Sequence, residues 1–345
     1  MRDRSIFAWT RVSAALSVCA LLVACADDAA GGADGPELLR AEAEAAPGAI
    51  TPEGMFPPPK PGYTRLHAAV MKGLKPGTDT MRCQYVQAPL DHDVDILGVE
   101  GYQSEGGHHA VAYASTVNAP LHVDRNCGME DNASQGAFLG GVGGEAGGGT
   151  SLPPGVAFRL KAGSSIMLNV HFLNVSDEIY DGYSVVDFKF AEVSAARPVA
   201  SMFTNGSFSF KIAPMSAAES VAECKVSKEF SFVTYSNHMH DYGTSVKSEI
   251  VRANGSVELI HEDPVWSYEM QFTGGGKTYG LDAPLKLHPG DKLRTTCKWK
   301  NPTVSLLTFP REMCIGVGFF LSDGSSSPVC FNGTFIDMAP RAAPH

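Results

Sequence analysis

The sequence predicts an all-β protein built from two tandem antiparallel domains of the β-sandwich or jelly-roll kind. From Tyr63 onward it shows no convincing long amphipathic helical pattern. Instead, short runs rich in β-branched and aromatic residues are separated by Gly, Pro, Asn and Asp, which is typical of sandwiches. At 345 residues, the chain is also long enough for two domains.

The expected strands fall into two series on either side of residues 195–199 (Ala-Ala-Arg-Pro-Val), which we interpret as a hinge between the two halves. The first series comprises residues 81–87, 109–115, 156–160, 166–173 and 184–193. The second comprises residues 208–212, 229–235, 244–251, 256–260, 293–299 and 314–321. We therefore predict an N-terminal domain over residues 62–194 and a C-terminal domain over residues 195–340.

The first 24 residues are predicted to be a signal peptide. Arginines precede an apolar run at residues 14–24, which is too short to span a bilayer permanently. The run ends Leu22-Val-Ala-Cys25, which resembles a bacterial lipobox, so we expect cleavage before Cys25 and lipidation of that residue. The following Ala26 resembles the signal for outer-membrane sorting. The alternative is an ordinary secretory signal with a chance cysteine; export is expected in both cases.

Residues 25–61 are predicted to form a flexible tether. They consist mainly of Ala, Gly, Glu, Asp and Pro, and close with Phe56-Pro-Pro-Pro-Lys-Pro61. Such a composition cannot bury a core, and the prolines extend the chain. We expect the tether to hold the folded part away from a membrane, with the lipid at Cys25 as the anchor.

Cysteine usage and charge narrow the function further. Six cysteines remain after Cys19 and Cys25 are set aside, and an even number in an oxidising compartment predicts three disulfides, for which 15 connectivities are possible. These are Cys83, Cys127, Cys224, Cys297, Cys314 and Cys330. The formal net charge is -10 without a basic tract, so nucleic acid is not expected as a partner. The glycine-rich segment 140–149 lacks the context of a phosphate-binding loop and is interpreted as a mobile connection.

Two histidine groups are candidates for metal chemistry. His238 and His240 are spaced to face the same side of a strand, and Met313 adds a thioether. Two imidazoles with one soft sulfur suit copper better than magnesium, calcium or a structural zinc. The plain alternative is a surface His-x-His and a core methionine.

The second group is His108, His109 and His171. Adjacent ligands on a regular strand face opposite ways, so His108 and His109 require an irregular backbone, which Gly106 and Gly107 can supply. Asn169 shares a strand face with His171, but a hydrogen-bonding amide in the core is the favoured interpretation for it.

Together the order His-His, His, His-x-His, Met resembles the copper type II, ascorbate-dependent monooxygenases, the group of peptidylglycine α-hydroxylating monooxygenase and dopamine β-monooxygenase. The likeness extends from about Tyr63 to about Leu321. It is clearest in the segments 152–159, 169–172, 232–240, 290–297 and 312–314.

The resemblance implies two jelly-roll domains facing a solvent-filled cleft, with one copper on each. His108, His109 and His171 would hold an electron-transfer copper, and His238, His240 and Met313 the copper at which O2 binds and a substrate C–H bond is hydroxylated. Ascorbate or a similar one-electron reductant would reduce both ions. The family pattern also implies the disulfides Cys83–Cys127, Cys224–Cys330 and Cys297–Cys314.

The chain departs from the peptide-amidating members at the positions that hold a peptide carboxylate. Ser236, Ile315 and Val317 stand where those members carry Arg, Asn and Tyr. Because a carboxylate needs a charged or bidentate partner, we expect a non-peptide organic substrate with apolar character.

Two rival functions stay open. One is a lipoprotein that binds copper for sequestration or sensing without turnover. The other is a jelly-roll carbohydrate-binding protein with incidental histidines, which would bind no copper tightly. The other histidines that we considered (His67, His92, His122, His261 and His288) are expected to have surface or capping roles, and Tyr242 and the three tryptophans are expected only to pack.

Overall fold

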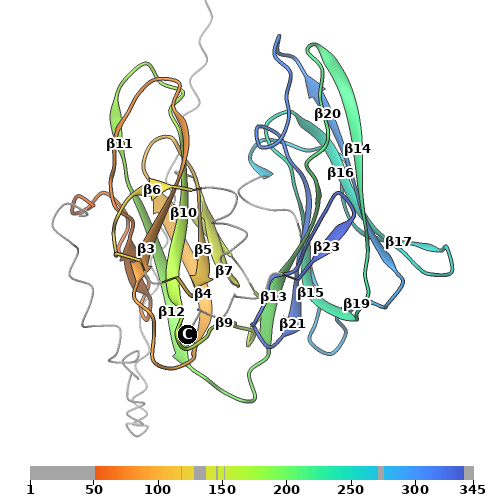
Figure 1. The fold of residues 1–345 in the computed structure, drawn as a ribbon, viewed down its shortest axis with the longest axis horizontal. Coiled ribbons are helices and arrows are strands. Elements are labelled where there is room, and N and C mark those ends of the chain that lie inside the picture. Colours follow the sequence, from red (N-terminus) through yellow and green to blue (C-terminus); the bar gives the residue numbers. More distant parts are fainter. Residues whose placement is uncertain are drawn as a thin grey trace, which may run out of the picture. The chain divides into compact units, whose positions relative to one another are not determined.

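The structure is a computed structural model that describes residues 51–117, 119–127, 137–144, 147–150, 152–270 and 276–337. The predicted signal peptide, Cys25 and most of the tether lie outside these residues. These described residues belong to one compact unit. All elements assigned in the described part are β-strands, mostly antiparallel, which confirms the predicted all-β class (Figure 1).

The N-terminal half contains two five-stranded sheets, which we call the N-terminal sheet pair. The first has the order β1-β12-β4-β8, with β9 also paired to β4. Its strands are β1 (Thr64–His67), β4 (Val94–Gln103), β8 (Gly148–Thr150), β9 (Phe158–Leu160) and β12 (Ser184–Glu192). The second has the order β6-β3-β10-β5-β7. Its strands are β3 (Asp79–Gln87), β5 (Gly107–Ser115), β6 (Arg125–Asn126), β7 (Phe138–Gly143) and β10 (Ser165–Leu173), and the short strands β2 (Met71–Leu74) and β11 (Tyr180–Gly182) pair with each other.

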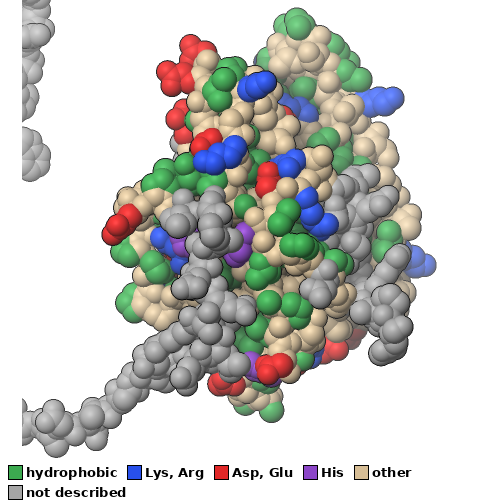
Figure 2. All heavy atoms as spheres, turned by 60° about the vertical axis from the view of Figure 1, so that its left-hand side comes forward, with side chains coloured by type: hydrophobic (Ala, Val, Ile, Leu, Met, Phe, Trp, Pro, Cys, Tyr) green, Lys and Arg blue, Asp and Glu red, His purple; other side chains and the backbone are tan. Residues whose placement is uncertain are grey.

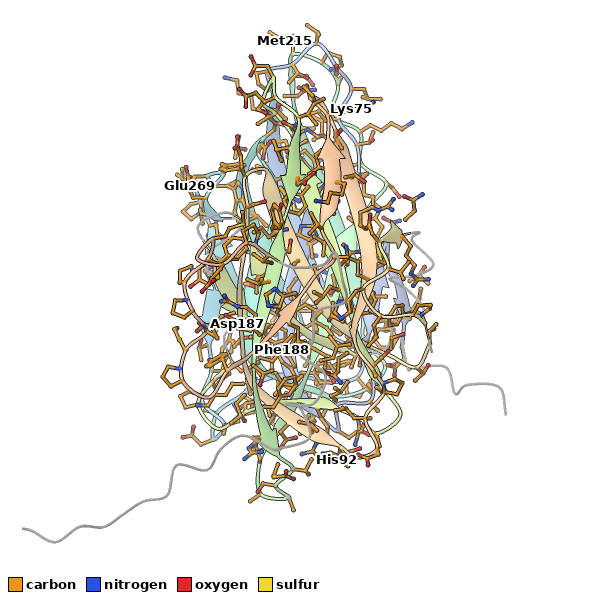
Figure 3. The ribbon with its side chains drawn as sticks, turned by 90° about the vertical axis from the view of Figure 1, so that its left-hand side faces the viewer. Lys75, His92, Asp187, Phe188, Met215 and Glu269 are labelled. Atoms are coloured by element: carbon orange, nitrogen blue, oxygen red, sulfur yellow. A yellow bond between two sulfur atoms is a disulfide. The ribbon has the colours of Figure 1, made fainter. Side chains whose placement is uncertain are left out.

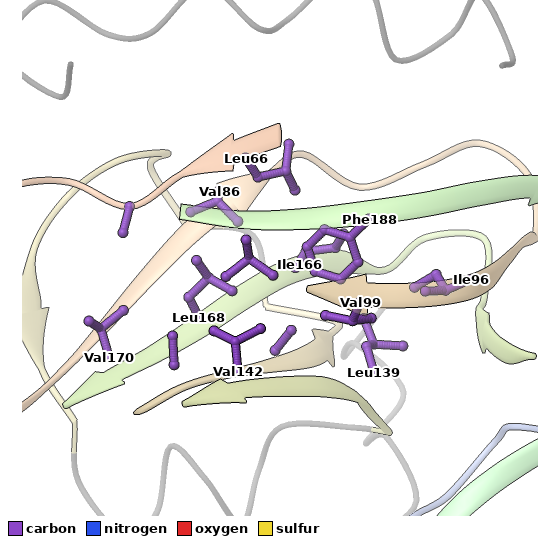
Figure 4. Close-up of a cluster of buried hydrophobic side chains, with 14 of the residues drawn as sticks. Leu66, Val86, Ile96, Val99, Leu139, Val142, Ile166, Leu168, Val170 and Phe188 are labelled. Atoms are coloured by element: carbon purple, nitrogen blue, oxygen red, sulfur yellow. The ribbon is translucent and has the colours of Figure 1, made fainter. Parts of the chain in front are cut away.

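A continuous apolar core lies between these two sheets. Alternate residues of β10, including Ile166, Leu168 and Val170, belong to one apolar cluster with Val99 of β4 and Phe188 of β12 (Figure 4). All five side chains are buried, and burial of this size contributes about 1.5–3 kcal/mol per large apolar side chain. The alternation leaves the intervening positions Asn169 and His171 on the other face of β10.

The C-terminal half contains a seven-stranded and a four-stranded sheet, the C-terminal sheet pair. The larger has the order β18-β15-β21-β13-β22-β23, with β19 also paired to β15. Its strands are β13 (Val199–Ser207), β15 (Phe230–His238), β18 (Gly276–Thr278), β19 (Leu285–Leu287), β21 (Cys314–Ser322), β22 (Val329–Phe331) and β23 (Thr334–Ile336). The smaller has the order β14-β20-β16-β17 and consists of β14 (Ser216–Lys225), β16 (Gly243–Val251), β17 (Val257–Asp263) and β20 (Lys292–Asn301).

The glycine-rich segment is not the loop that we expected. Residues 138–143 form β7, which pairs with β5, and residues 148–150 form β8, which pairs with β4. A Cβ at Gly149 would lie 2.0 Å from the carbonyl oxygen of Val99, so only glycine allows this close approach of the two backbones. Here the glycines serve strand packing rather than mobility.

The expected strand at residues 208–212 is also wrong. β13 ends at Ser207, and the following residues make only an isolated bridge between Ile212 and Leu307. The ring of Phe208 instead packs against the tilted rings of Phe309 and Phe331, with centroids 4.0 and 4.1 Å away. These apolar residues pack against other aromatic rings, and in sequence such a run looks the same as a strand.

Residues 193–198 connect β12 to β13 and thus join the two sheet pairs, at the position expected for the hinge. Arg197 in this connection bonds to Asp95 of β4 at 2.5 Å, and Asp95 also accepts a hydrogen bond from Arg159 of β9. Further along, Phe319 of β21 contacts Phe138 and Phe158, with centroids 5.7 and 5.3 Å away. The connection is therefore restrained by a buried carboxylate and by aromatic contacts.

The described part of the chain contains three disulfides: Cys83–Cys127, Cys224–Cys330 and Cys297–Cys314. They are the pairings that the resemblance implied. Cys297–Cys314 joins β20 to the first residue of β21, across the two sheets of the C-terminal pair. Among the described residues, no helix has the length and apolarity that crossing a bilayer requires.

Candidate metal centre

His108, His109 and His171 come together on neighbouring strands. The backbone register pairs His109 of β5 with His171 of β10, and the register shifts directly after His171, where Phe172 pairs with Gly107. Gly106 has a φ of 74°, which glycine adopts readily. This irregularity gives the adjacent histidines the backbone freedom that two neighbouring ligands need, and one ring nitrogen from each of the three lies within 4.8 Å of the others.

The nitrogen atoms of this three-histidine group are arranged to hold a cation. The Nδ1 atoms of His108 and His109 lie 3.0 Å apart. His171 lies with Nε2 2.7 Å from Oδ1 of Asp79, so the ring donates Nε2–H to the carboxylate and leaves the Nδ1 lone pair for another partner. That Nδ1 atom is buried without a hydrogen-bond partner in the structure, which a metal ion would supply.

Burial keeps His109 neutral and able to bind a metal. It lowers the pKa of His109 well below its ordinary value, and the neighbouring imidazoles His171 and His108 lower it further. Imidazole is a ligand that suits copper, zinc, iron and nickel. The geometry thus fits a metal site without choosing the metal.

His238 and His240 stand at the end of β15. They face the same side of the chain, with ring centroids 5.1 Å apart, while Met239 between them is fully buried in the C-terminal core. His240 donates its Nδ1–H to the carbonyl oxygen of Arg311 at 3.2 Å, and its own carbonyl accepts the indole N–H of Trp266 at 3.0 Å. These contacts leave Nε2 of His240 available as a ligand.

Met313 lies next to this His238–His240 group through strand pairing. The register of β15 and β21 ends with the pair His238 and Ile315. Beyond this last pair, the chain continues to His240 on one side and back to Met313, one residue before β21, on the other. The thioether side chain is half-buried. Cys314, directly after it, is tied to β20 by a disulfide, which restrains the position of Met313.

The two histidine groups adjoin each other. The ring centroids of His108 and His240 lie 5.4 Å apart, close to the 4.7 Å between His108 and His171. The resemblance implied a solvent-filled cleft between two separate sites, whereas here one imidazole of the first group contacts one of the second. Histidine side chains reach the surface near the middle of the face drawn in Figure 2.

Burial depresses the basicity of the second group as well. It lowers the pKa of His238 to about 4, and the neighbouring His108 adds to the shift. Burial also lowers the pKa of His240 well below its usual range, assisted by His238. Both rings are therefore neutral at physiological pH and present lone pairs.

The sequence patterns did not indicate a role for Glu312. Its side chain is fully buried, and its carboxylate accepts hydrogen bonds from the backbone N–H of His240 and Tyr242 and from the indole N–H of Trp299. Tyr242 and Trp299, together with Trp266, were expected only to pack. The available signal was an acidic residue directly before a candidate ligand in a segment that leads into a buried strand.

The other described histidines lie outside these two groups. His261 bonds to Asp263, His288 to Glu229, and His92 to the adjacent Asp91. In Figure 3, His92 lies at the end of the molecule opposite Lys75 and Met215. On the face in Figure 2, lysines and arginines are scattered among acidic side chains rather than gathered in a basic patch.

Comparison with protein families identifies the C-terminal half. Residues 199–334 match the model for the copper type II ascorbate-dependent monooxygenase, C-terminal domain. This half of the chain is therefore similar to the C-terminal domain of the copper type II ascorbate-dependent monooxygenases. The matched range begins at the first residue of β13 and includes His238, His240 and Met313. Among curated proteins, no match was found.

Solved structures resemble the chain only weakly. The major capsid protein P2 of bacteriophage PM2 has a TM-score of 0.36 at 8% identity and covers 76% of this chain and 98% of its own. The protein PNGF-II has a TM-score of 0.30 at 10% identity, over 76% of this chain and 65% of its own. PBCV-1 VP54, fitted into a reconstruction of the virophage Sputnik, has a TM-score of 0.27 at 6% identity, over 76% and 95%. Likeness at this level carries no conclusion about function.

Proposed function

We propose that this protein is a copper monooxygenase that hydroxylates a C–H bond of an organic substrate with O2 and an ascorbate-like reductant. The observation that carries the proposal is the presence of two ligand groups in a chain whose C-terminal half matches this family. One ring nitrogen from each of three histidines lies within 4.8 Å of the others, and two more histidines lie in the matched domain, where Met313 directly precedes the strand paired with His238.

The ligand chemistry supports a division of labour between the two groups. His108, His109 and His171 would hold one copper, for which an all-imidazole set permits both oxidation states. His238, His240 and Met313 would hold the second, where the soft sulfur favours Cu(I). When bound, the two coppers would each supply one electron to the reduction of O2. The 5.4 Å between the rings of His108 and His240 gives a short path between the two groups.

We further propose that the substrate is an uncharged, non-peptide compound with apolar character. Ser236 lies two residues before His238 on β15, and its register partners are Val317 and Gly276. His238 is paired with Ile315. These neighbouring positions carry no charge to bind a carboxylate, and the half-buried Val317 offers an apolar wall beside the His238–His240 group.

The proposed location is the outer membrane of a bacterium, through a lipid at Cys25. The three disulfides support an exported protein, because such bonds persist in oxidising compartments. Mass spectrometry of the protein purified from a bacterial host would test the anchor. Replacement of Cys25 by Ser would release the protein into the soluble fraction, and a variant that stays in the membrane would contradict the proposal.

The first test is copper stoichiometry. A soluble fragment beginning at Pro61, reconstituted with copper, is expected to hold two tightly bound ions per chain, and Met313→Ile is expected to weaken one of them selectively. Met202→Ile is the matched control, because this half-buried methionine lies on β13 against the N-terminal core. One ion or none in the unaltered fragment would refute the two-copper proposal.

The second test is turnover. Oxygen consumption that requires ascorbate and rises with an apolar substrate would support the monooxygenase, whereas two bound coppers without such consumption for any tested compound would favour copper storage or sensing. Efficient glyoxylate release from a peptide ending in glycine would contradict the non-peptide substrate.

A further inference from the structure

Glu312 occupies a position from which one carboxylate can set the geometry of two candidate ligands. It directly precedes Met313 in the chain, and it contacts the His240 segment in space. Oε2 accepts the backbone N–H of His240 at 3.3 Å, and Oε1 accepts the backbone N–H of Tyr242 at 2.8 Å. These two bonds hold the segment 240–242 against the segment that carries Met313.

The surroundings of Glu312 are built for a buried carboxylate. The residue is 0% exposed, and Oε2 also accepts the indole N–H of Trp299 at 3.0 Å. Trp299 is itself fixed by stacking on Phe210, with ring centroids 4.7 Å apart. The nearest cation along the chain, Arg311, pairs with Asp241 instead, and within the described residues no ion pair reaches Glu312. The three N–H donors therefore replace the water that burial removes.

Contacts around Glu312 reinforce the same two segments. The carbonyl oxygen of Arg311 accepts the Nδ1–H of His240, and the guanidinium of Arg311 lies 5.4 Å from the ring centroid of Tyr242. A carboxylate buried without a cation is costly to keep for stability alone, because an apolar side chain of similar volume could fill the space. Its bonds instead reach the two segments that carry the ligands.

We infer that Glu312 is the positioning residue of the His238–His240–Met313 copper site, holding His240 and the Met313 thioether in one ligand geometry. This inference rests on the proposed copper function. Glu312 does not touch copper or substrate in this role; it acts through its backbone bonds and through its neighbour in the chain. Outer partners of metal ligands commonly change metal affinity by about 10- to 100-fold when they are altered.

The informative substitution is Glu312→Gln, which keeps the volume but removes one acceptor. The amide would have to place its NH2 toward either the Tyr242 N–H or the pair of donors on Oε2, so at least one bond is lost. Asp291→Asn is the matched control. Asp291 is likewise buried in the C-terminal sheet pair and accepts the backbone N–H of His288 and Ala253 at 3.0 Å, in a different loop.

The first measurement needs no metal. In the copper-free protein, Glu312→Gln is expected to speed hydrogen exchange at the amides of His240 and Tyr242 by about tenfold, the factor for one lost bond of about 1.4 kcal/mol. Asp291→Asn is expected to leave those two amides unchanged and to expose those of His288 and Ala253. Unchanged exchange at His240 and Tyr242 in the Glu312 variant would overturn the inference, whatever the metal content.

The second measurement uses copper itself. Glu312→Gln is expected to lower copper affinity at one site by about 10- to 100-fold and to diminish the sulfur contribution to the X-ray absorption spectrum of the Cu(I) protein, leaving the three-histidine site intact. Asp291→Asn should keep both. Wild-type affinity and an unchanged sulfur signal in the Glu312 variant would overturn the inference while the copper function stands. A wild-type protein that binds no copper would refute the proposed function and with it this role.

Discussion

Removal of single disulfides is expected to separate stability from copper binding. Cys297–Cys314 closes a separation of 17 residues and Cys224–Cys330 one of 106. A cross-link stabilises the folded protein chiefly by restricting the unfolded chain, and the effect grows with the logarithm of the loop length. Replacement of both cysteines by Ala should therefore lower the unfolding free energy by about 3 kcal/mol for the shorter loop and about 5 kcal/mol for the longer one.

Copper binding should follow the opposite order. Cys314 directly follows Met313, and its bond to Cys297 ties this part of the chain to β20. Cys330 lies on β22, paired with β13, away from the candidate ligands in the chain and in the sheet order. Cys297→Ala/Cys314→Ala should thus weaken copper at the His238–His240–Met313 site, while Cys224→Ala/Cys330→Ala should leave that affinity unchanged despite the larger loss of stability.

Urea unfolding gives the free energies, and competition with a chelator of known affinity gives the copper affinity of each variant at a temperature where all remain folded. A larger loss of stability for the Cys297/Cys314 variant than for the Cys224/Cys330 variant would refute the loop argument. Equal loss of copper in both variants would refute the claim that the shorter disulfide acts on Met313.

Three other outcomes are expected. Copper-free protein should lose stability as pH falls, because the pKa of His238 is about 4 in the folded protein and about 6.5 in the unfolded chain. The contribution of the neutral His238 ring to the unfolding free energy is complete above pH 6.5 and is lost by about pH 4. It amounts to at most about 3 kcal/mol, which urea unfolding across that range would measure. Asp79→Asn should weaken copper binding at the three-histidine site by about tenfold, because His171 loses its carboxylate partner; chelator competition that shows equal affinity would contradict this. Asp95→Asn should lower the unfolding free energy by about 3 kcal/mol, because Arg159 and Arg197 lose the fully buried carboxylate to which they bond. A change below about 1 kcal/mol in urea unfolding would contradict the view that Asp95 restrains the connection between the two sheet pairs.

Much of the fold class was accessible from local pattern. The run at residues 166–173 predicted a strand, and β10 spans Ser165–Leu173 in the structure. Local pattern failed where long-range contacts overrode it. Residues 140–149 contain glycines that suggested a loop, but Gly149 is glycine because the backbone of Val99 lies against it, and that contact joins residues about 50 positions apart.

The sequence by itself determined which candidate metal ligands are present and how they are spaced. These are the imidazoles of His108, His109 and His171, the i, i+2 spacing of His238 and His240, and the order in which these residues occur. These follow from side-chain identity and from the two-residue period of a strand, which are local properties. The order of the candidate ligands resembles that of a family whose C-terminal domain model the C-terminal half matches. That resemblance rests on the same local information.

Only the tertiary structure decided which groups assist those ligands. Glu312 reaches His240 across 72 positions and Asp79 reaches His171 across 92, while the rings of His108 and His240 meet although the residues lie in different halves of the chain. Such contacts depend on strand register and on how sheets pack, because a hydrogen bond forms only when its atoms come within about 3 Å. The number of residues between two positions in the sequence does not determine the distance between their atoms in the folded protein.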